Sequence, residues 1–228
     1  FIDMELCQLD QVYLHDLKEY NKILMQRNKL LKQISFQPSL EDTLDIWDMQ
    51  LLQYGESIIK RRSQFIEEIG ETVTKVNENL TGNKEHLQML YEPDVTIDEF
   101  ANKLNNYRER DKKLFSTSVG PHRDDLCFMN KDIDIRKYGS QGQQRTCALS
   151  LKLAEIEIVK NMTGDSPVLL LDDVLSELDR NRQNYLLDSI HDIQTIITCT
   201  GIEEFIDSRL TLDRIFRIKE GTVFIEKE

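Results

Sequence analysis

The stretch VLLLDDVLSELD, residues 168–179, decides the fold of this chain. A continuous apolar run is typical of a strand buried in a parallel sheet, and two carboxylates, Asp172 and Asp173, follow it directly. Open α/β folds bind their ligands at this carboxyl edge of the sheet. Asp172 could hold Mg²⁺ through water, because hard cations prefer oxygen ligands. Asp173 could orient or deprotonate an attacking water. A strand end with two solvated carboxylates is the alternative.

A second stretch, YGSQGQQRT at residues 138–146, leads into a helical pattern. Gly139 and Gly142 would let the backbone approach a ligand closely, and Ser140 and Gln143 supply side-chain donors. The start of the following helix would present free N–H groups and the positive end of its dipole to an anion. The stretch is therefore a candidate phosphate contact. The alternative is a glycine loop that only caps the helix with Ser140.

Residues 1–82 are predicted to form a helical arm. Apolar and aromatic residues recur at alternating spacings of three and four, which predicts one long helix before Pro38 and a second over residues 44–80. Ser39 and Asp42 after the break give a helix-start signal of the capping-box type. Two long helices joined by a short turn should fold back as an antiparallel hairpin.

Residues 83–228 show the alternation of strands and helices that is typical of an α/β layer fold. The predicted elements, in chain order, are a strand at 86–92, a helix from Thr96 to about Leu114 opened by a capping box with Glu99, two strands around a turn at 130–131, a helix at 143–161, buried strands at 168–172 and 195–199 on either side of a helix at 179–191, and a hairpin turning at 220–221.

The 228 residues carry a formal net charge of −12, which argues against a protein that binds nucleic acid over its whole surface. Any contact with DNA must be local. Two basic clusters on the predicted arm could provide one, although solvated helix faces are the more common role of such residues. These clusters are Arg27, Lys29 and Lys32 in the first helix, and Lys60, Arg61 and Arg62 in the second.

Other features exclude several classes of protein. No apolar run approaches the roughly 18 residues that cross a bilayer, and no signal peptide follows Phe1, so we expect a cytoplasmic protein without a membrane partner. The first residue is Phe rather than Met, which suggests a piece of a longer protein. His122 is predicted to be a buried, hydrogen-bonded structural residue. The scattered cysteines are predicted to be reduced core thiols and not zinc ligands: Cys7, Cys127, Cys147 and Cys199.

The motifs together resemble the signature, Walker B strand and D-loop of the ABC-type ATPases, a class that includes the structural-maintenance-of-chromosomes proteins. The RecF family of bacterial recombination mediators is more similar still. GPHRDD at 120–125 and QRNKLLK at 26–32 also look like hallmarks of that family, in its order, and the resemblance covers essentially the whole chain. It implies an ABC-ATPase-like head lobe with signature and Walker B over 83–228, and a helical-hairpin arm over 1–82.

The resemblance also implies roles for single residues. Asp172 matches the Mg²⁺-associated Walker B aspartate, Asp173 the catalytic acid and Asp179 the D-loop aspartate. The signature that contacts the γ-phosphate held by the opposite subunit corresponds to Ser140, Gly142 and Gln143. Gln141 departs from the more usual glycine of the ABC signature. The position of the ABC switch histidine is taken by the threonine-rich segment 198–200.

No G-x-x-x-x-G-K-[ST] phosphate loop occurs in the sequence. In the RecF family that loop lies before the arm, so the chain resembles the C-terminal part of such a protein and should not bind or hydrolyse ATP well by itself. The full-length protein would be a weak DNA-stimulated ATPase that requires Mg²⁺.

The resemblance implies a role in recombinational DNA repair. The full-length protein would form an ATP-dependent homodimer, clamp duplex DNA next to single-strand gaps and, with RecR, help to load RecA. Two alternatives stay open. The chain could be half of another SMC-like chromosome-maintenance ATPase, or a non-catalytic docking module whose arm binds a partner helix.

Overall fold

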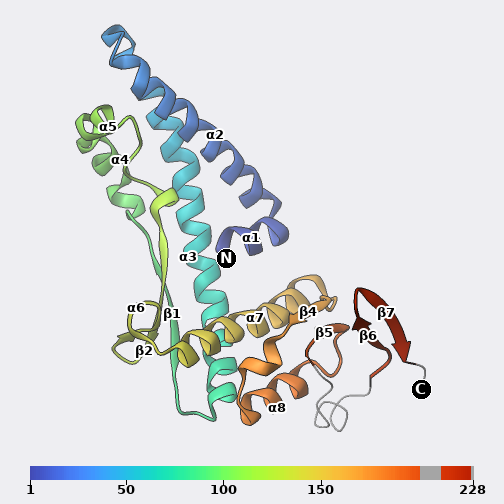
Figure 1. Cartoon of the computed structure of the whole chain (residues 1–228). Coiled ribbons are helices and arrows are strands. Elements are labelled where there is room, and N and C mark those ends of the chain that lie inside the picture. Colours follow the sequence, from blue (N-terminus) through green and yellow to red (C-terminus); the bar gives the residue numbers. More distant parts are fainter. Residues whose placement is uncertain (201–211, 227–228) are drawn as a thin grey trace.

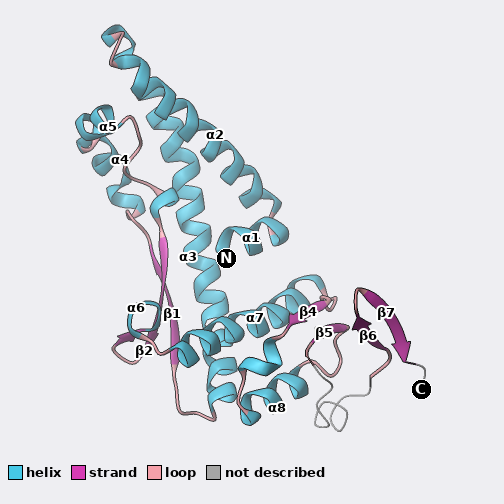
Figure 2. Ribbon diagram, in the orientation of Figure 1, coloured by secondary structure: helices cyan, strands magenta, loops and turns pink. Residues whose placement is uncertain are grey.

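The computed structural model describes residues 1–200 and 212–226. Two long helices form an arm, and the remaining helices and three small sheets lie along one of them and at its base (Figures 1 and 2). No helix of the described residues is long and apolar enough to cross a membrane.

The arm is an antiparallel pair, as predicted. Helix α2 (Gln11–Ile34) packs against α3 (Leu44–Thr81), and α1 (Ile2–Leu9) precedes them. The prediction of one unbroken first helix was wrong at Asp10. The Asp10 carboxylate accepts hydrogen bonds from the backbone N–H groups of Val12 and Tyr13 and caps α2, so the chain turns there although the apolar spacing continues across it.

Helix α3 begins later than its predicted start signal. Residues Pro38–Thr43 form a 3₁₀ helix, and α3 starts at Leu44 without a side-chain cap, so Ser39 does not open it. The far end agrees with the prediction, because Gly82 closes α3 in the left-handed conformation, at φ 62°.

The last turns of α3 belong to the main core. Helix α3 packs against α7 (Gln141–Thr163), β1 (Leu87–Glu92) and α8 (Arg180–Ser189). A single cluster of buried side chains joins them and includes Ile69, Leu80, Leu153 and Leu186. The division of the chain at residue 82 stays a proposal, and α3 is the element shared between the two parts.

The first sheet lies alongside α3 and is antiparallel. Strand β1 pairs with β2 (Asp125–Asn130), which pairs with β3 (Ile133–Asp134) around a turn at residues 131–132, one residue later than predicted. The second predicted strand is therefore only two residues long, and the chain continues into the short helix α6 (Ile135–Tyr138).

Two helices connect β1 to β2 where one was predicted. They are α4 (Ile97–Asn106) and α5 (Arg108–Leu114), which meet at Tyr107. The predicted capping box at Thr96 does not form, because its hydroxyl contacts the carboxylate of Glu99 rather than a backbone N–H.

The second sheet is the predicted parallel pair. Strand β4 (Leu169–Asp172) lies beside β5 (Thr195–Thr198), with α8 between them in sequence. The apolar runs predicted strands that are buried on both faces. This prediction was wrong, because Leu170 and Ile196 are exposed. Strands β6 (Ile215–Lys219) and β7 (Thr222–Glu226) form the predicted hairpin around residues 220–221.

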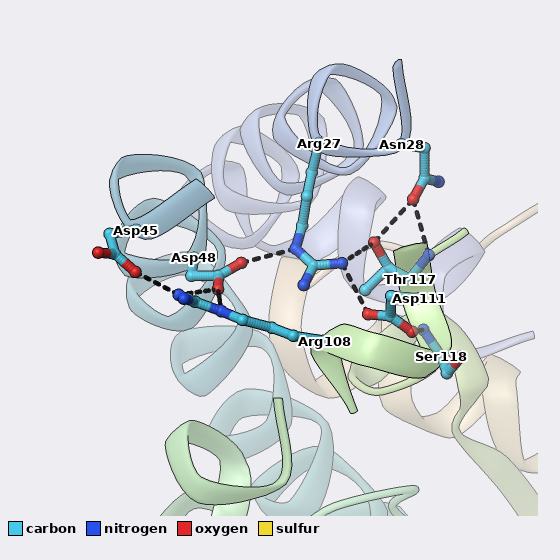
Figure 3. A network of polar contacts seen from close by, with 8 residues as sticks. All are labelled: Arg27, Asn28, Asp45, Asp48, Arg108, Asp111, Thr117 and Ser118. Atoms are coloured by element: carbon cyan, nitrogen blue, oxygen red, sulfur yellow. Dashed lines mark hydrogen bonds and ion pairs between the residues drawn. The ribbon is translucent and has the colours of Figure 1, made fainter. Parts of the chain in front are cut away.

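A buried arginine ties the arm to α5 (Figure 3). Arg27 is completely buried, and its guanidinium contacts Asp48 on α3 at 2.6 Å, Asp111 on α5 at 2.8 Å and the Thr117 hydroxyl at 2.8 Å. Both predicted roles for Arg27, a DNA contact or a solvated face, are therefore wrong. The Asn28 carboxamide oxygen continues the network by accepting from the backbone N–H and hydroxyl of Thr117.

A second buried arginine, Arg62 of α3, contacts two residues of the GPHRDD motif. Arg62 is buried, and it contacts Asp124 at 2.7 Å, the Pro121 carbonyl at 2.6 Å and Asp3 at 2.8 Å. The predicted DNA contact and the solvated face are therefore wrong for Arg62 as well. Its neighbour Arg61 pairs with Asp10 at 3.0 Å. The carboxyl group of Asp124 is surrounded, because it also accepts from Tyr91 and from the Asp94 backbone N–H.

His122 and Gly120 of the same motif pack against α2. Both ring nitrogens of the half-buried His122 are within hydrogen-bond distance of partners, the Tyr20 hydroxyl and the Thr117 carbonyl, which fits the predicted structural role. Burial lowers the pKa of His122. Gly120 has φ 129°, and a Cβ there would lie 2.5 Å from the Tyr20 hydroxyl. Of the cysteines, Cys127 and Cys147 are buried and Cys199 is exposed, so the prediction of core thiols was wrong for Cys199.

We expect Arg27→Met to lower the free energy of unfolding by about 3–5 kcal/mol, because it leaves Asp111 buried without its cation and Asp48 with Arg108 alone. Lys29→Met, two residues along the same helix but exposed, is the matched control and should change stability by less than about 0.5 kcal/mol. Urea unfolding followed by circular dichroism measures both. Equal effects would show that the buried network contributes little.

Glu5 is a buried carboxyl group at the contact between α1 and α7. It is 4% exposed, and its Oε1 atom has no hydrogen-bond partner among the described residues. Burial, followed by the neighbouring carboxylate of Glu155, raises the pKa of Glu5 to about 7, and nearby Lys152 offsets part of this shift. Glu5 is therefore protonated in the fold at pH values at which the unfolded chain has lost the proton.

This shift predicts that the chain loses stability as the pH rises from about 4.5 to about 7. Over that window the folded state holds a proton that the unfolded state has released, and the loss should be on the order of 1–3 kcal/mol. Glu5→Gln should flatten this part of the pH dependence. Denaturation midpoints at pH 5, 6 and 7 measure the effect, and parallel curves for the two proteins would contradict it.

Candidate nucleotide-binding site

The predicted signature residues lie at the start of α7. Ser140 caps the helix: its Oγ accepts from the Gln143 backbone N–H at 3.3 Å, and the Gln143 Oε1 accepts from the Ser140 backbone N–H at 3.0 Å. Both side chains are thus engaged in a full capping box. A cap by Ser140 alone was the predicted alternative to a ligand contact. The first turn of α7 is nevertheless at the surface, since Ser140 and Gln141 are exposed.

The two glycines of this loop differ in the space that a side chain would find. A Cβ on Gly139 would lie 2.5 Å from the Ile135 carbonyl oxygen, so the packing of α6 against the loop excludes a side chain there. A Cβ on Gly142 would meet only the Ser140 Oγ, at 4.0 Å. Gly142 alone therefore leaves the helix start open to a close approach, as predicted for a phosphate contact.

Asp172 and Asp173 lie at the carboxyl end of β4, as predicted, and both are exposed. The parallel register places Asp172 opposite Thr198 of β5. The Thr198 hydroxyl donates to the Asp172 carboxylate and lies 3.2 Å from the backbone N–H of Asp173, which also donates to the Thr198 carbonyl at 3.1 Å. Thr198 therefore contacts the side chain of Asp172 and the backbone of Asp173.

The backbone at Asp173 is unusual. Asp173 adopts the left-handed conformation, with φ 52° and ψ 19°, and the 3₁₀ helix Val174–Glu177 follows. Non-glycine residues in this region are uncommon and cluster at functional sites. The chain therefore turns directly after β4, at Asp173.

Asp179 is engaged in the local structure. Its carboxylate caps α8 by accepting from the N–H groups of Asn181 and Arg182 at 3.0 and 3.1 Å, and it forms an ion pair with Arg182 at 3.2 Å. The segment 174–179 also contacts the predicted signature helix, because Arg145 of α7 pairs with Glu177 at 3.3 Å. This ion pair is a direct link between α7 and the segment after β4.

The carboxylates of Asp172 and Asp173 suit a magnesium ion whose other ligands are water and phosphate. They suit an ion enclosed by protein ligands less well. In the part of the chain that the structure describes, no group of three or more His, Cys, Asp or Glu residues could hold a metal ion. Mg²⁺ is commonly bound through one or two carboxylates plus substrate phosphates, and the exposed pair Asp172 and Asp173 suits that mode. The open start of α7, beside Gly142, fits an anion.

Sequence reasoning missed the role of Thr198 and of Arg145. Thr198 lies in the segment that the resemblance predicts in place of the switch histidine, but only the strand register places its hydroxyl between the two aspartates. Arg145 follows the signature by two residues, and nothing in the sequence indicates a partner 32 residues away.

Comparisons with known proteins agree on one family. Curated proteins named DNA replication and repair protein RecF match almost the whole chain: 59% identity over 98% of it in Lachnoclostridium phytofermentans, 58% over 99% in Lachnospira eligens and 55% over 100% in Agathobacter rectalis. The chain spans about 62–63% of the length of these relatives. No protein-family model matches the chain.

Solved structures agree with the sequences. One, described as the recombination mediator protein RecF-ATP in the RecFOR pathway, matches with a TM-score of 0.87 and 38% identity. The match covers 99% of this chain and 61% of that one. A second, described as RecF-ATPrS in the same pathway, gives a TM-score of 0.85 at the same identity and covers 98% of this chain and 61% of that one.

We expect Thr198→Val to loosen the end of β4 and Thr198→Ser to preserve it. Valine keeps the branched shape but removes the hydroxyl between Asp172 and Asp173, at a cost of about 1 kcal/mol. Hydrogen exchange at the Asp173 amide should accelerate roughly fivefold in Thr198→Val and stay near the parental rate in Thr198→Ser. Equal exchange rates in all three proteins would show that the Thr198 hydroxyl does not stabilise the end of β4.

Proposed function

Because the chain belongs to the RecF family, we propose that it is part of an ATP-dependent DNA-binding protein that acts in recombinational DNA repair. The chain would supply the signature and the Walker B strand of an ATP-bound homodimer. The observation that carries this proposal is the exposed first turn of α7, with Gly142 open to a close approach, in a sequence without a phosphate-binding loop. A phosphate at this turn would have to be held mainly by other residues.

We assign the phosphate contact to Ser140, Gly142 and Gln143. The backbone N–H groups in the first turn of α7 would approach the γ-phosphate of an ATP molecule held by the second copy, and Gly142 leaves room for it. The Ser140 hydroxyl already accepts from the Gln143 N–H, so its own proton can be donated to a phosphate oxygen without loss of the helix cap.

We assign the hydrolytic side of the site to the aspartates. Asp172 would hold Mg²⁺ through water, and the bound ion would neutralise charge on the phosphates. Asp173 would orient or deprotonate the attacking water. Asp179, which caps α8, would lie at the interface with the second copy. Thr198 would keep Asp172 and Asp173 in their relative positions.

The exposed apolar residues of the parallel sheet support the assignment to a larger protein. Val168, Leu170 and Ile196 are 55%, 69% and 57% exposed, although strands with such runs are usually covered on both faces. We propose that residues of the full-length protein outside this chain cover this face. By itself the chain should be inactive as an ATPase, since it lacks a phosphate-binding loop.

We propose duplex DNA next to single-strand gaps, RecR and a second copy as partners, ATP and Mg²⁺ as cofactors, and the cytoplasm as the location. RecA loading would be the outcome. Two other functions stay as alternatives: half of another SMC-like chromosome-maintenance ATPase, and a docking module without catalysis. Magnesium-dependent ATP hydrolysis by the full-length protein separates the docking module from the other two.

The signature assignment predicts different outcomes for two substitutions at Ser140 in the full-length protein. Aspartate caps helices as well as serine does, so Ser140→Asp should keep the fold but place a negative charge against the γ-phosphate and abolish ATP-dependent dimerisation. Ser140→Ala loses the cap, at about 0.5–2 kcal/mol, but should still dimerise in part. Light scattering with and without ATP, alongside thermal melts, measures both.

The hydrolytic assignment is tested in the same protein. Asp173→Asn should preserve the ATP-bound dimer and slow phosphate release by about 10²–10⁴-fold, because the water loses its orienting carboxylate. If Ser140→Asp dimerises on ATP as the parent does, the signature assignment fails. If Asp173→Asn hydrolyses at the parental rate, Asp173 is not the catalytic carboxylate.

A further inference from the structure

The QRNKLLK segment of α2 faces two directions. Arg27 and Asn28 point to the buried network with Asp111 and Thr117, whereas Lys29 and Lys32 are exposed. At 3.6 residues per turn, these lysines lie about 200° and 140° around the helix from Arg27. The predicted basic cluster therefore lies on two sides of α2. Arg27 is buried, and Lys29 and Lys32 are the members that can contact a partner.

The exposed lysines continue along the same side of α2. Lys18 and Lys22 are also exposed, and their helical phases are about 180° and 220° from Arg27. We call the four residues the lysine stripe: Lys18, Lys22, Lys29 and Lys32. The stripe spans roughly 21 Å at 1.5 Å per residue. It faces away from the side chains that α2 buries against α3, among them Tyr20, Ile23 and Leu30.

Four carboxylates near the arm tip are engaged on the α5 side and not with the stripe, whereas Asp42 at the tip is exposed. Asp48 pairs with Arg27 and Arg108, Asp45 also contacts Arg108, and Glu41 pairs with Lys112 at 2.8 Å. Asp111 faces Arg27.

The stripe itself has one acidic neighbour. Lys22 contacts Glu19 at 3.2 Å, in an exposed pair. Across residues 1–200 and 212–226, no carboxylate forms an ion pair with Lys18, Lys29 or Lys32. In a chain of net charge −12, the outer face of α2 is a local region of positive charge.

We propose that the lysine stripe binds the phosphate backbone of DNA. A polyanion needs regularly placed cations and no pocket, and the stripe offers cations without an apolar groove. A protein partner would require buried apolar anchors, whereas on this side of α2 Met25 is the exposed apolar side chain among the described residues. The inference deepens the proposed DNA-binding function by naming the surface, and it rests on that function.

The test compares two quadruple variants of the full-length protein. The stripe variant is K18Q/K22Q/K29Q/K32Q. The matched control, K75Q/K84Q/K131Q/K160Q, removes the same charge from four other exposed lysines. A fluorescent 30-base-pair duplex of arbitrary sequence is titrated with each protein, with ATP present, from about 50 to 200 mM salt. Circular dichroism confirms that both variants fold.

Four phosphate contacts correspond to a salt slope of about −3.6, or roughly 100-fold in affinity between 50 and 200 mM salt. We expect the stripe variant to lose most of this slope, at about one unit per lysine that contacts a phosphate. It should bind the duplex at least 10-fold more weakly at 50 mM salt. The control should stay within about twofold of the parent.

Three results would overturn the inference. The first is equal slopes and affinities for the stripe variant and the parent. The second is an equal loss in the control, which would indicate a general charge effect. The third is a loss of binding to poly-glutamate but not to the duplex, which would assign the stripe to an acidic protein segment. If the parent itself does not bind the duplex, the proposed DNA-binding function fails, and the question of the surface does not arise.

Discussion

The buried guanidinium of Arg27 is the contact on which the arrangement of the arm depends. A cation removed from water is costly unless it is paired and hydrogen-bonded, and Arg27 finds Asp48, Asp111 and Thr117 at one point. These partners come from α3, α5 and the segment after α5. One side chain therefore fixes the positions of three parts of the chain relative to one another. Apolar packing, which is not directional, does not fix them in the same way.

Periodicity predicted the elements well and the polar interior poorly. The hairpin arm, the parallel pair β4 and β5 and the end of α3 near residue 80 follow from spacing and from local residue types. The burial of Arg27 and Arg62 does not, because each depends on carboxylates far along the chain, Asp111 and Asp124. The break at Asp10 was missed for a related reason: its cap competes locally with an apolar pattern that continues across it.

The candidate site shows the same division. The sequence placed Asp172 and Asp173 at a strand end and Ser140 at a helix start, and each is there. It could not show that Ser140 and Gln143 are already bonded to each other's backbone. A serine used in a cap is pre-oriented, so it can meet an incoming anion with little further loss of side-chain freedom. Structural and ligand-binding roles are compatible at this residue.

The length of α3 has a mechanical consequence. Its 38 residues run as one helix from the tip of the arm into the main core (Figure 1), a rod of roughly 57 Å. A tilt of about 5° where α3 meets α7 would move the far end by about 5 Å on that length. Small repacking beside α7 would therefore be amplified into displacement at the tip, and a load on the tip would return to α7 with the same leverage.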